Sequence, residues 1–105
     1  MLMNNRSTKE LPYNLFQEKF SNEKAILIDV RSNQEYEEGH LNGAINIPLY
    51  QLERKIKNIE KNKQAIILLY CLTGFRSSEG QKILENLGYN NVYSLKGGLN
   101  QIWSK

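Results

Sequence analysis

Residues 65–76 of the chain read AIILLYCLTGFR, and this stretch decides the fold class. Its first six residues form an apolar run that does not alternate with polar residues, which is typical of a strand buried on both faces of a parallel sheet. Residues 25–28 form a second run of this kind, which leads into Asp29. Weaker patterns predict two further strands, at residues 44–47 and 91–95.

Helical patterns lie between the expected strands. Apolar side chains recur at intervals of three and four over residues 49–59, which predicts a helix with one apolar face. A similar pattern over residues 83–87 predicts another helix, which Gly88 would end.

Two shorter helices are expected in the first half of the chain. Ser32 and Glu35 have the spacing of a capping box, so a helix should begin at Asn33. Residues 12–20 should form a further short helix. Because strands and helices alternate along the chain, we expect an α/β sandwich with a mainly parallel sheet.

Length and composition indicate a small globular protein. The 105 residues fit a single domain, for which we expect a core over residues 11–103 and a flexible segment over residues 1–10. The net charge of +3 comes from basic residues interleaved with acidic ones, a pattern that does not indicate a nucleic-acid partner. We see no secretion signal, and no apolar run approaches the roughly 20 residues that span a bilayer. We therefore expect a cytoplasmic protein without a nucleic-acid or membrane partner.

Cys71 is the only cysteine, which excludes an intramolecular disulfide and a zinc site built from cysteines. It follows the expected strand directly, at the carboxyl end of the sheet, where ligands of open α/β sheets bind. The loop then turns at Gly74 and leads into a helix that should start near Ser77. Backbone N–H groups, the positive end of that helix and the charge of Arg76 would surround the sulfur. Such surroundings favour a thiolate and stabilise a persulfide, so Cys71 could take a sulfur atom from a donor and yield it to an acceptor.

Two other roles for Cys71 are open. A lone cysteine at the end of a buried strand often serves only as a small apolar side chain, but the glycine and arginine that follow at loop spacing favour a reactive role. Cysteine phosphatases also place a cysteine and an arginine at the two ends of a ring of amides, with five residues between them. Here four residues separate Cys71 from Arg76. The shorter ring suits one sulfur atom better than a tetrahedral phosphate.

The whole pattern resembles the rhodanese homology domain, from about Leu11 to Trp103. The signatures of that family occur in the family's order, at residues 27–31, 35–36, 39–41, 43–48, 70–77 and 92–98 and at Trp103. The match at residues 70–77 includes the six-residue length of the active-site loop. Together and in this order, the signatures are highly specific.

The resemblance implies a three-layer α/β/α domain with a five-stranded parallel sheet. It also implies transfer of sulfane sulfur from a donor, such as thiosulfate or a low-molecular-weight persulfide, to a thiol or cyanide. Cys71 would be the catalytic sulfur carrier, and Arg76 would close the loop and help to hold the charge of the donor. The outer sulfur would be bound by the backbone amides of Leu72, Thr73, Gly74, Phe75 and Arg76. No metal and no organic cofactor is expected.

Three functions fit these residues. The first is a multiple-turnover sulfurtransferase of the thiosulfate or thiol type. The second is a persulfide relay module that serves a protein donor and a protein acceptor. The third is a non-catalytic regulatory domain, whose usual sign is a lost cysteine or arginine, whereas both are present here. Leu72 and Phe75 would make the mouth of the loop apolar, so we hypothesise that thiosulfate is a poor substrate and that a larger persulfide or a protein donor is preferred.

Three residues outside the loop are further candidates. Asp29 and Arg31 should lie close to the Cys71 loop, and we favour an ion pair that fixes adjacent loops and supports the site over one that tunes its charge. His40 is the only histidine and could be a general base. Its position in a turn after a short helix favours a structural role.

The remaining features concern packing and surface. Gly97 and Gly98 should form a tight turn with unusual backbone angles. Trp103 should lie in the core or form a lid, and Gly80 could mark a close approach of its helix to the sheet. Residues 54–63 are basic on their polar face, which fits either a solvated surface or docking to an acidic protein.

Overall fold

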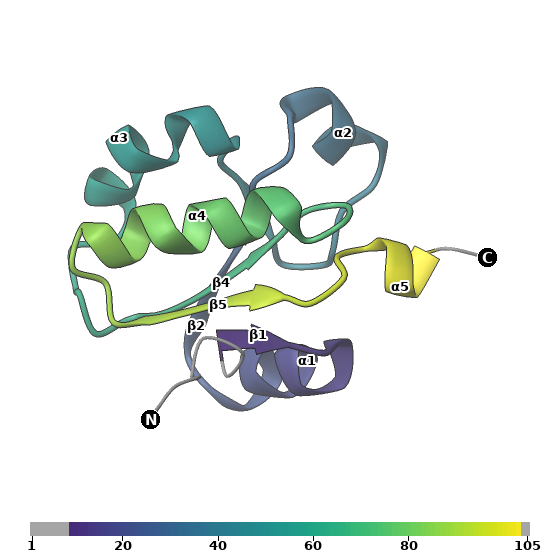
Figure 1. The fold of residues 1–105 in the computed structure, drawn as a ribbon, viewed down its shortest axis with the longest axis horizontal. Coiled ribbons are helices and arrows are strands. Elements are labelled where there is room, and N and C mark those ends of the chain that lie inside the picture. Colours follow the sequence, from purple (N-terminus) through teal and green to yellow (C-terminus); the bar gives the residue numbers. More distant parts are fainter. Residues whose placement is uncertain (1–8, 104–105) are drawn as a thin grey trace.

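The computed structural model describes residues 9–103, in which helices and strands alternate (Figure 1). In chain order, the elements are β1 (Glu10–Leu11), α1 (Tyr13–Asn22), β2 (Ala25–Asp29), α2 (Asn33–Glu38), β3 (Ile45–Asn46), α3 (Leu49–Ile59), β4 (Ile66–Tyr70), α4 (Phe75–Asn86), β5 (Asn91–Leu95) and α5 (Asn100–Trp103). Glu10, which lies in the segment that we expected to be flexible, pairs with Ser94 in the sheet. Residues 1–8 lie outside the described residues.

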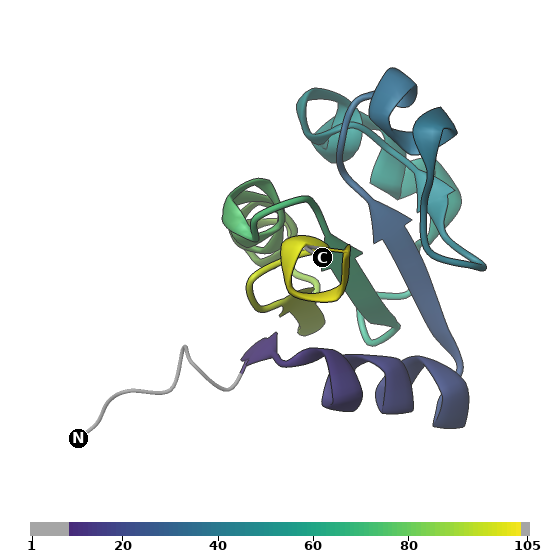
Figure 2. The same cartoon turned by 90° about the vertical axis from the view of Figure 1, so that its right-hand side faces the viewer.

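The sheet is parallel throughout, as expected, with the strand order β1-β5-β4-β2-β3. The four strands predicted from apolar patterns are present as β2, β3, β4 and β5. β2 and β4 are neighbours, and their register pairs Asp29 with Tyr70. The segments that follow these two residues therefore leave the sheet side by side at its carboxyl edge, which faces the viewer in Figure 2.

Two apolar clusters cover the two faces of the sheet, which gives three layers. Helices α3 and α4 pack on one face and α1 on the other (Figure 1). Within β4, Ile67 and Leu69 belong to the first cluster, whereas Leu68 and Tyr70 belong to the second. Both faces of this strand are buried, which explains why its sequence does not alternate. Burial of each such side chain contributes about 1.5–3 kcal/mol to folding.

The structure confirms several of the helix ends that the sequence predicts. Helix α3 has the predicted bounds, and the Ser32–Glu35 capping box is formed at the start of α2. Gly88 follows α4 with a φ of 101°, and Tyr89 N–H donates to the Leu84 carbonyl at 3.0 Å, as in a Schellman motif. Within residues 9–103, no helix combines the length and apolar character that crossing a membrane requires.

Helix α4 begins at Phe75, two residues before the predicted start near Ser77. The reason is Gly74, whose φ of 100° and ψ of −11° reverse the chain within one residue. Farther along the helix, a Cβ at Gly80 would lie 3.1 Å from side-chain atoms of both Leu52 and Leu69. Gly80 thus permits the close approach of α4 to α3 and the sheet that the sequence suggested.

Candidate functional site

Cys71 is the first residue after β4, and only 1% of it is exposed. Two backbone N–H groups donate to its sulfur, from Gly74 at 3.1 Å and from Ser77 at 3.3 Å. The Cys71 thiol lies 3.7 Å from the Ser77 hydroxyl oxygen, which itself donates to the Gly74 carbonyl at 3.2 Å. The sulfur therefore lies in a small polar niche whose N–H dipoles favour negative charge on it.

The Cys71 loop turns at Gly74 and leads into a helix, as the sequence predicts. Of the five amides expected to bind the outer sulfur of a persulfide, that of Gly74 donates to the Cys71 sulfur itself, whereas Phe75 N–H donates to the Thr73 hydroxyl oxygen at 3.4 Å. Sequence reasoning missed Ser77 as a member of the site. The position of Ser77 at the predicted start of the helix could have indicated this role, because the first N–H groups of a helix lack partners within the helix.

The turn that follows β5 is hydrogen-bonded to the Cys71 loop. Leu99 N–H donates to the Cys71 carbonyl and Asn100 N–H to the Leu72 carbonyl, each at 2.9 Å. The turn has the unusual backbone angles predicted for Gly97 and Gly98, with φ values of 77° and 65°. A side chain at Gly98 would collide with the carbonyl of Leu72. The glycine is therefore required for the turn to lie against the loop.

Arg76 is held by a carboxylate that sequence reasoning did not assign to the site. Its guanidinium donates to both oxygens of Glu35, at 2.8 and 3.0 Å, and each side chain is about one third exposed. The hydrogen bonds from Arg76 lower the pKa of Glu35 to about 2, and those to Glu35 raise the pKa of Arg76. The positive charge predicted at the end of the loop is thus present, but a negative charge compensates it.

Asp29 and Arg31 form the predicted ion pair. The guanidinium of Arg31 lies 2.8 Å from an Asp29 carboxylate oxygen, and both side chains are buried. Burial by itself would lower the pKa of Arg31, but the hydrogen bond and charge of Asp29 raise it. Arg31 also donates to the Gly39 carbonyl at 2.6 Å, so the pair ties the end of β2 to the segment after α2.

Two other predicted residues lie in structural positions. The ring of His40 stacks on that of Tyr36 at a centroid distance of 3.7 Å, and its Nδ1 lies 2.8 Å from the Tyr36 carbonyl oxygen. These contacts agree with the structural role that we favoured. Trp103 is 45% exposed, and its ring centroid lies 5.6 Å from the guanidinium of Arg31. Of the two expected positions, core or lid, the core is therefore excluded.

The two apolar residues of the loop have different surroundings. Phe75 is 73% exposed, as expected for a residue at the mouth of the loop. Leu72 is half-buried and packs against the apolar cluster on the α1 side of the sheet. The apolar mouth that we attributed to both residues is therefore mainly formed by Phe75.

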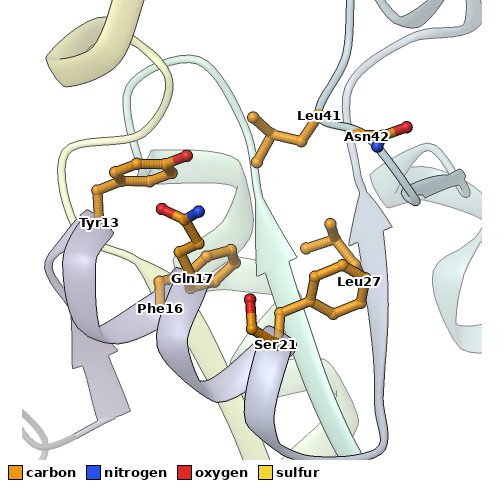
Figure 3. Close-up of a pocket in the computed structure, with 8 residues that line it drawn as sticks. Tyr13, Phe16, Gln17, Ser21, Leu27, Leu41 and Asn42 are labelled. Carbon is orange, nitrogen blue, oxygen red and sulfur yellow. The ribbon is translucent and has the colours of Figure 1, made fainter.

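Two hollows differ in their relation to this loop. A groove of about 260 Å³ includes Arg76 in its lining, together with Val30, Ser32, Pro48, Leu49 and Tyr50. A second hollow of about 240 Å³ lies between α1, β2 and the segment after α2, where Phe16, Leu27 and Leu41 line it (Figure 3). This second hollow contains no residue of the Cys71 loop. Of these two hollows, only the groove has a residue of the Cys71 loop, Arg76, in its lining.

Comparison with known protein sequences points to a single family. The rhodanese-like domain family matches residues 13–105. The chain is 44% identical over 75 residues to the uncharacterized protein YqhL of Bacillus subtilis, a match that covers 71% of this chain and 58% of YqhL. It is 37% identical over 75 residues to the thiosulfate sulfurtransferase PspE of Escherichia coli, with 71% of each chain covered. It is 34% identical over 80 residues to a tRNA uridine(34) hydroxylase of Erwinia tasmaniensis, covering 72% of this chain but only 23% of that protein.

Solved structures share the fold. A rhodanese with anions from E. coli has a TM-score of 0.68 and 35% identity, and the match covers 75% of this chain and 92% of that one. The human single-domain sulfurtransferase TSTD1 has a TM-score of 0.79 and 21% identity, with coverages of 92% and 96%. The second likeness concerns the fold alone.

Proposed function

Because the chain belongs to the rhodanese-like domain family, we propose that it is a sulfurtransferase in which Cys71 carries sulfane sulfur as a persulfide. The donor is thiosulfate or a low-molecular-weight persulfide, and the acceptor is a thiol or cyanide. One observation carries this proposal: the N–H groups of Gly74 and Ser77 donate to the Cys71 sulfur at 3.1 and 3.3 Å. Fixed donors of this kind stabilise negative charge on the sulfur throughout the reaction.

The reaction has two half-reactions that balance without an oxidant. The Cys71 thiolate first attacks the sulfane sulfur of the donor. A new S–S bond forms, the bond that held this sulfur in the donor breaks, and its electron pair leaves with sulfite or a thiolate. The acceptor then attacks the outer sulfur of the persulfide, the S–S bond to Cys71 breaks, and its electron pair returns to the Cys71 sulfur.

The other residues of the site have supporting roles in this proposal. Amides of Leu72 to Arg76 surround the outer sulfur, and Arg76 closes the loop through its ion pair with Glu35. Since Glu35 compensates the charge of Arg76, a compact dianion such as thiosulfate finds little net positive charge there. This favours an organic persulfide as donor. Asp29 and Arg31 support the site by fixing the neighbouring loop.

A relay between two proteins is the second candidate function. The exposed aromatic ring of Phe75 at the mouth of the loop favours it, because exposed aromatic side chains are enriched at protein interfaces. A cytoplasmic location belongs to both proposals, since a lone reactive thiol is better maintained in a reducing compartment. The hydroxylation of tRNA by the larger relatives is not part of either proposal.

Steady-state turnover tests the proposal. Wild-type protein should form thiocyanate from cyanide with thiosulfate or glutathione persulfide as donor, and Cys71→Ser should form none. The His40→Asn variant is a matched control, because His40 contacts Tyr36 and should leave the rate unchanged within about twofold. Hydrolysis of an aryl phosphate that disappears in Cys71→Ser, in a protein that forms no thiocyanate, would replace the proposal with phosphatase chemistry.

A further inference from the structure

The outer face of α3 carries a row of exposed side chains that the proposed reaction does not use. Tyr50, Arg54 and Lys57 are four and three residues apart, so they lie on one side of the helix. They are exposed, whereas Leu52 and Ile56 on the opposite side are buried. Among the salt bridges within residues 9–103, none involves Arg54 or Lys57. We call these three residues the α3 face.

Tyr50 connects the α3 face to the reactive loop. It is 81% exposed, and it lines the groove of about 260 Å³ that also reaches Arg76. The residue after Arg76 is Ser77, whose N–H donates to the Cys71 sulfur. The groove therefore extends from Arg76, the last residue of the Cys71 loop, to the first turn of α3. Helices α3 and α4 lie next to each other on the same face of the sheet (Figure 1).

The chemistry of the surface changes along this path. Val30, Pro48 and Leu49 make the groove apolar, and the charge of Arg76 at its end is compensated by Glu35. The α3 face next to it is positive. A partner that fits both parts has an apolar side chain next to its reacting thiol and acidic residues farther away. A polypeptide can place these groups in this order.

A polypeptide fits the surface better than a nucleic acid. Glu53 is an exposed carboxylate on the same helix, and such a charge would repel a continuous polyanion, whereas a polypeptide can avoid it. The groove is lined mainly by aliphatic residues and by one aromatic ring, which gives little surface for stacked bases.

We propose that the α3 face and the groove dock an acidic polypeptide whose cysteine exchanges sulfur with Cys71. This inference rests on the proposed function. The partner's thiolate attacks the outer sulfur of the Cys71 persulfide. A new S–S bond forms on the partner, the Cys71 S–S bond breaks, and its electron pair returns to the Cys71 sulfur. Basic residues raise the rate of encounter, and the groove holds the apolar side chain beside the loop.

Synthetic peptides test this docking directly. Full-length protein is loaded with sulfur from thiosulfate or glutathione persulfide, and transfer to a peptide is followed by quenching and intact mass. One peptide has a leucine next to its cysteine and several aspartates nearby. A second has lysines in place of the aspartates, and a third has glycine in place of the leucine. We expect the first peptide to react about tenfold faster than the second at low salt, and the difference to shrink at high salt.

Matched variants locate the effect on the surface. Arg54→Glu should remove most of the preference for the aspartate peptide. Lys24→Glu is its control, because it makes the same charge change at an exposed residue before β2, and this variant should retain the preference. Tyr50→Ser should remove most of the preference for leucine, whereas Leu15→Ser removes an exposed apolar side chain from α1 and should keep it. Transfer to cyanide should be the same in all four variants.

Several outcomes would overturn the inference. Docking at this surface is excluded if the three peptides react at equal rates, or if the test and control variants lose the peptide preferences equally. The proposed function stays intact in either case as long as cyanide still accepts sulfur. If an RNA homopolymer inhibits transfer more strongly than polyglutamate does, the surface binds nucleic acid and the inference is wrong. Failure of both donors to load Cys71 refutes the proposed function, and the inference fails with it.

Discussion

At the scale of single residues, the sulfur of Cys71 combines apolar burial with polar contacts. The residue belongs to the cluster on the α3 and α4 side of the sheet, together with Val30 and Ile47. Its sulfur nevertheless receives N–H groups from Gly74 and Ser77. In a site with little water, these dipoles act more strongly than they would at the surface. A charged sulfur can therefore be stabilised without a metal or a second cysteine in contact with it.

The ion pair between Glu35 and Arg76 leads to a prediction about stability. Glu35→Gln should keep the capping box, since glutamine also serves at that position, but lose the ionic contact. At pH 7 the free energy of unfolding should fall by about 1 kcal/mol, as measured by urea denaturation. Folding lowers the pKa of Glu35 from 4.5 to about 2, so its contribution is present above pH 4.5 and is lost as the pH falls toward 2.

The difference between wild type and Glu35→Gln should therefore shrink over that pH range. Glu37→Gln is the control, because Glu37 is exposed on the same helix and enters none of the salt bridges within residues 9–103. It should change stability by less than about 0.5 kcal/mol. A difference for Glu35→Gln that stays constant down to pH 2 would show that the ion pair is not its cause.

Phe75 leads to a prediction about the donor. Because 73% of its surface is exposed, Phe75→Lys should fold normally and place an uncompensated positive charge at the mouth of the loop. The kcat/KM for thiosulfate should rise about threefold to tenfold, because the charge attracts the dianion. Phe75→Ser is the control that removes the ring without adding charge. An equal rise in both variants, or no rise in Phe75→Lys, would contradict the electrostatic explanation.

At the scale of elements, the turn between β5 and α5 fixes the reactive loop. The N–H groups of Leu99, in this turn, and of Asn100, the first residue of α5, donate to the carbonyls of Cys71 and Leu72. The loop is thus held by its own helix α4 on one side and by this turn on the other. The two N–H groups that contact the sulfur depend on this support for their positions.

Gly98→Ala tests the support. Gly98 has a φ of 65°, and an added Cβ would collide with the Leu72 carbonyl. Gly88 has a φ of 101°, but an added Cβ there would meet only a Lys63 side-chain atom at 3.8 Å. Gly88→Ala should therefore cost only the backbone strain, about 1–2 kcal/mol. Gly98→Ala should cost more in urea denaturation and should also slow thiocyanate formation at least tenfold. Equal stability losses with full activity in both variants would show that the turn does not position the loop.

The elements were largely predictable, and the contacts between them were not. The runs at residues 25–28 and 65–70 predicted β2 and β4 because strands buried on both faces leave little choice of residue. Glu35 was assigned to a capping box and to a family signature but not to the site, since its bond to Arg76 joins residues 41 positions apart. The inward packing of Leu72 also depends on tertiary contacts that no local pattern contains.

At the scale of the whole molecule, the parallel sheet brings distant segments to one edge. The ends of β2 and β4 lie side by side, so the Asp29–Arg31 pair and the Cys71 loop leave the sheet together. Helix α2 contributes Glu35 to Arg76, and α5 begins with the residue whose N–H binds the loop (Figure 2). The site is therefore a product of the complete fold of residues 9–103, although its reactive atom lies on a single loop.

The most direct test of the central claim is the intact mass of the protein after incubation with thiosulfate or with glutathione persulfide. Wild type should become heavier by one sulfur atom, Cys71→Ser should not, and later addition of cyanide should remove the added mass as thiocyanate. A wild-type mass that stays unchanged with both donors, or a gain that persists in Cys71→Ser, would contradict a persulfide carried by Cys71.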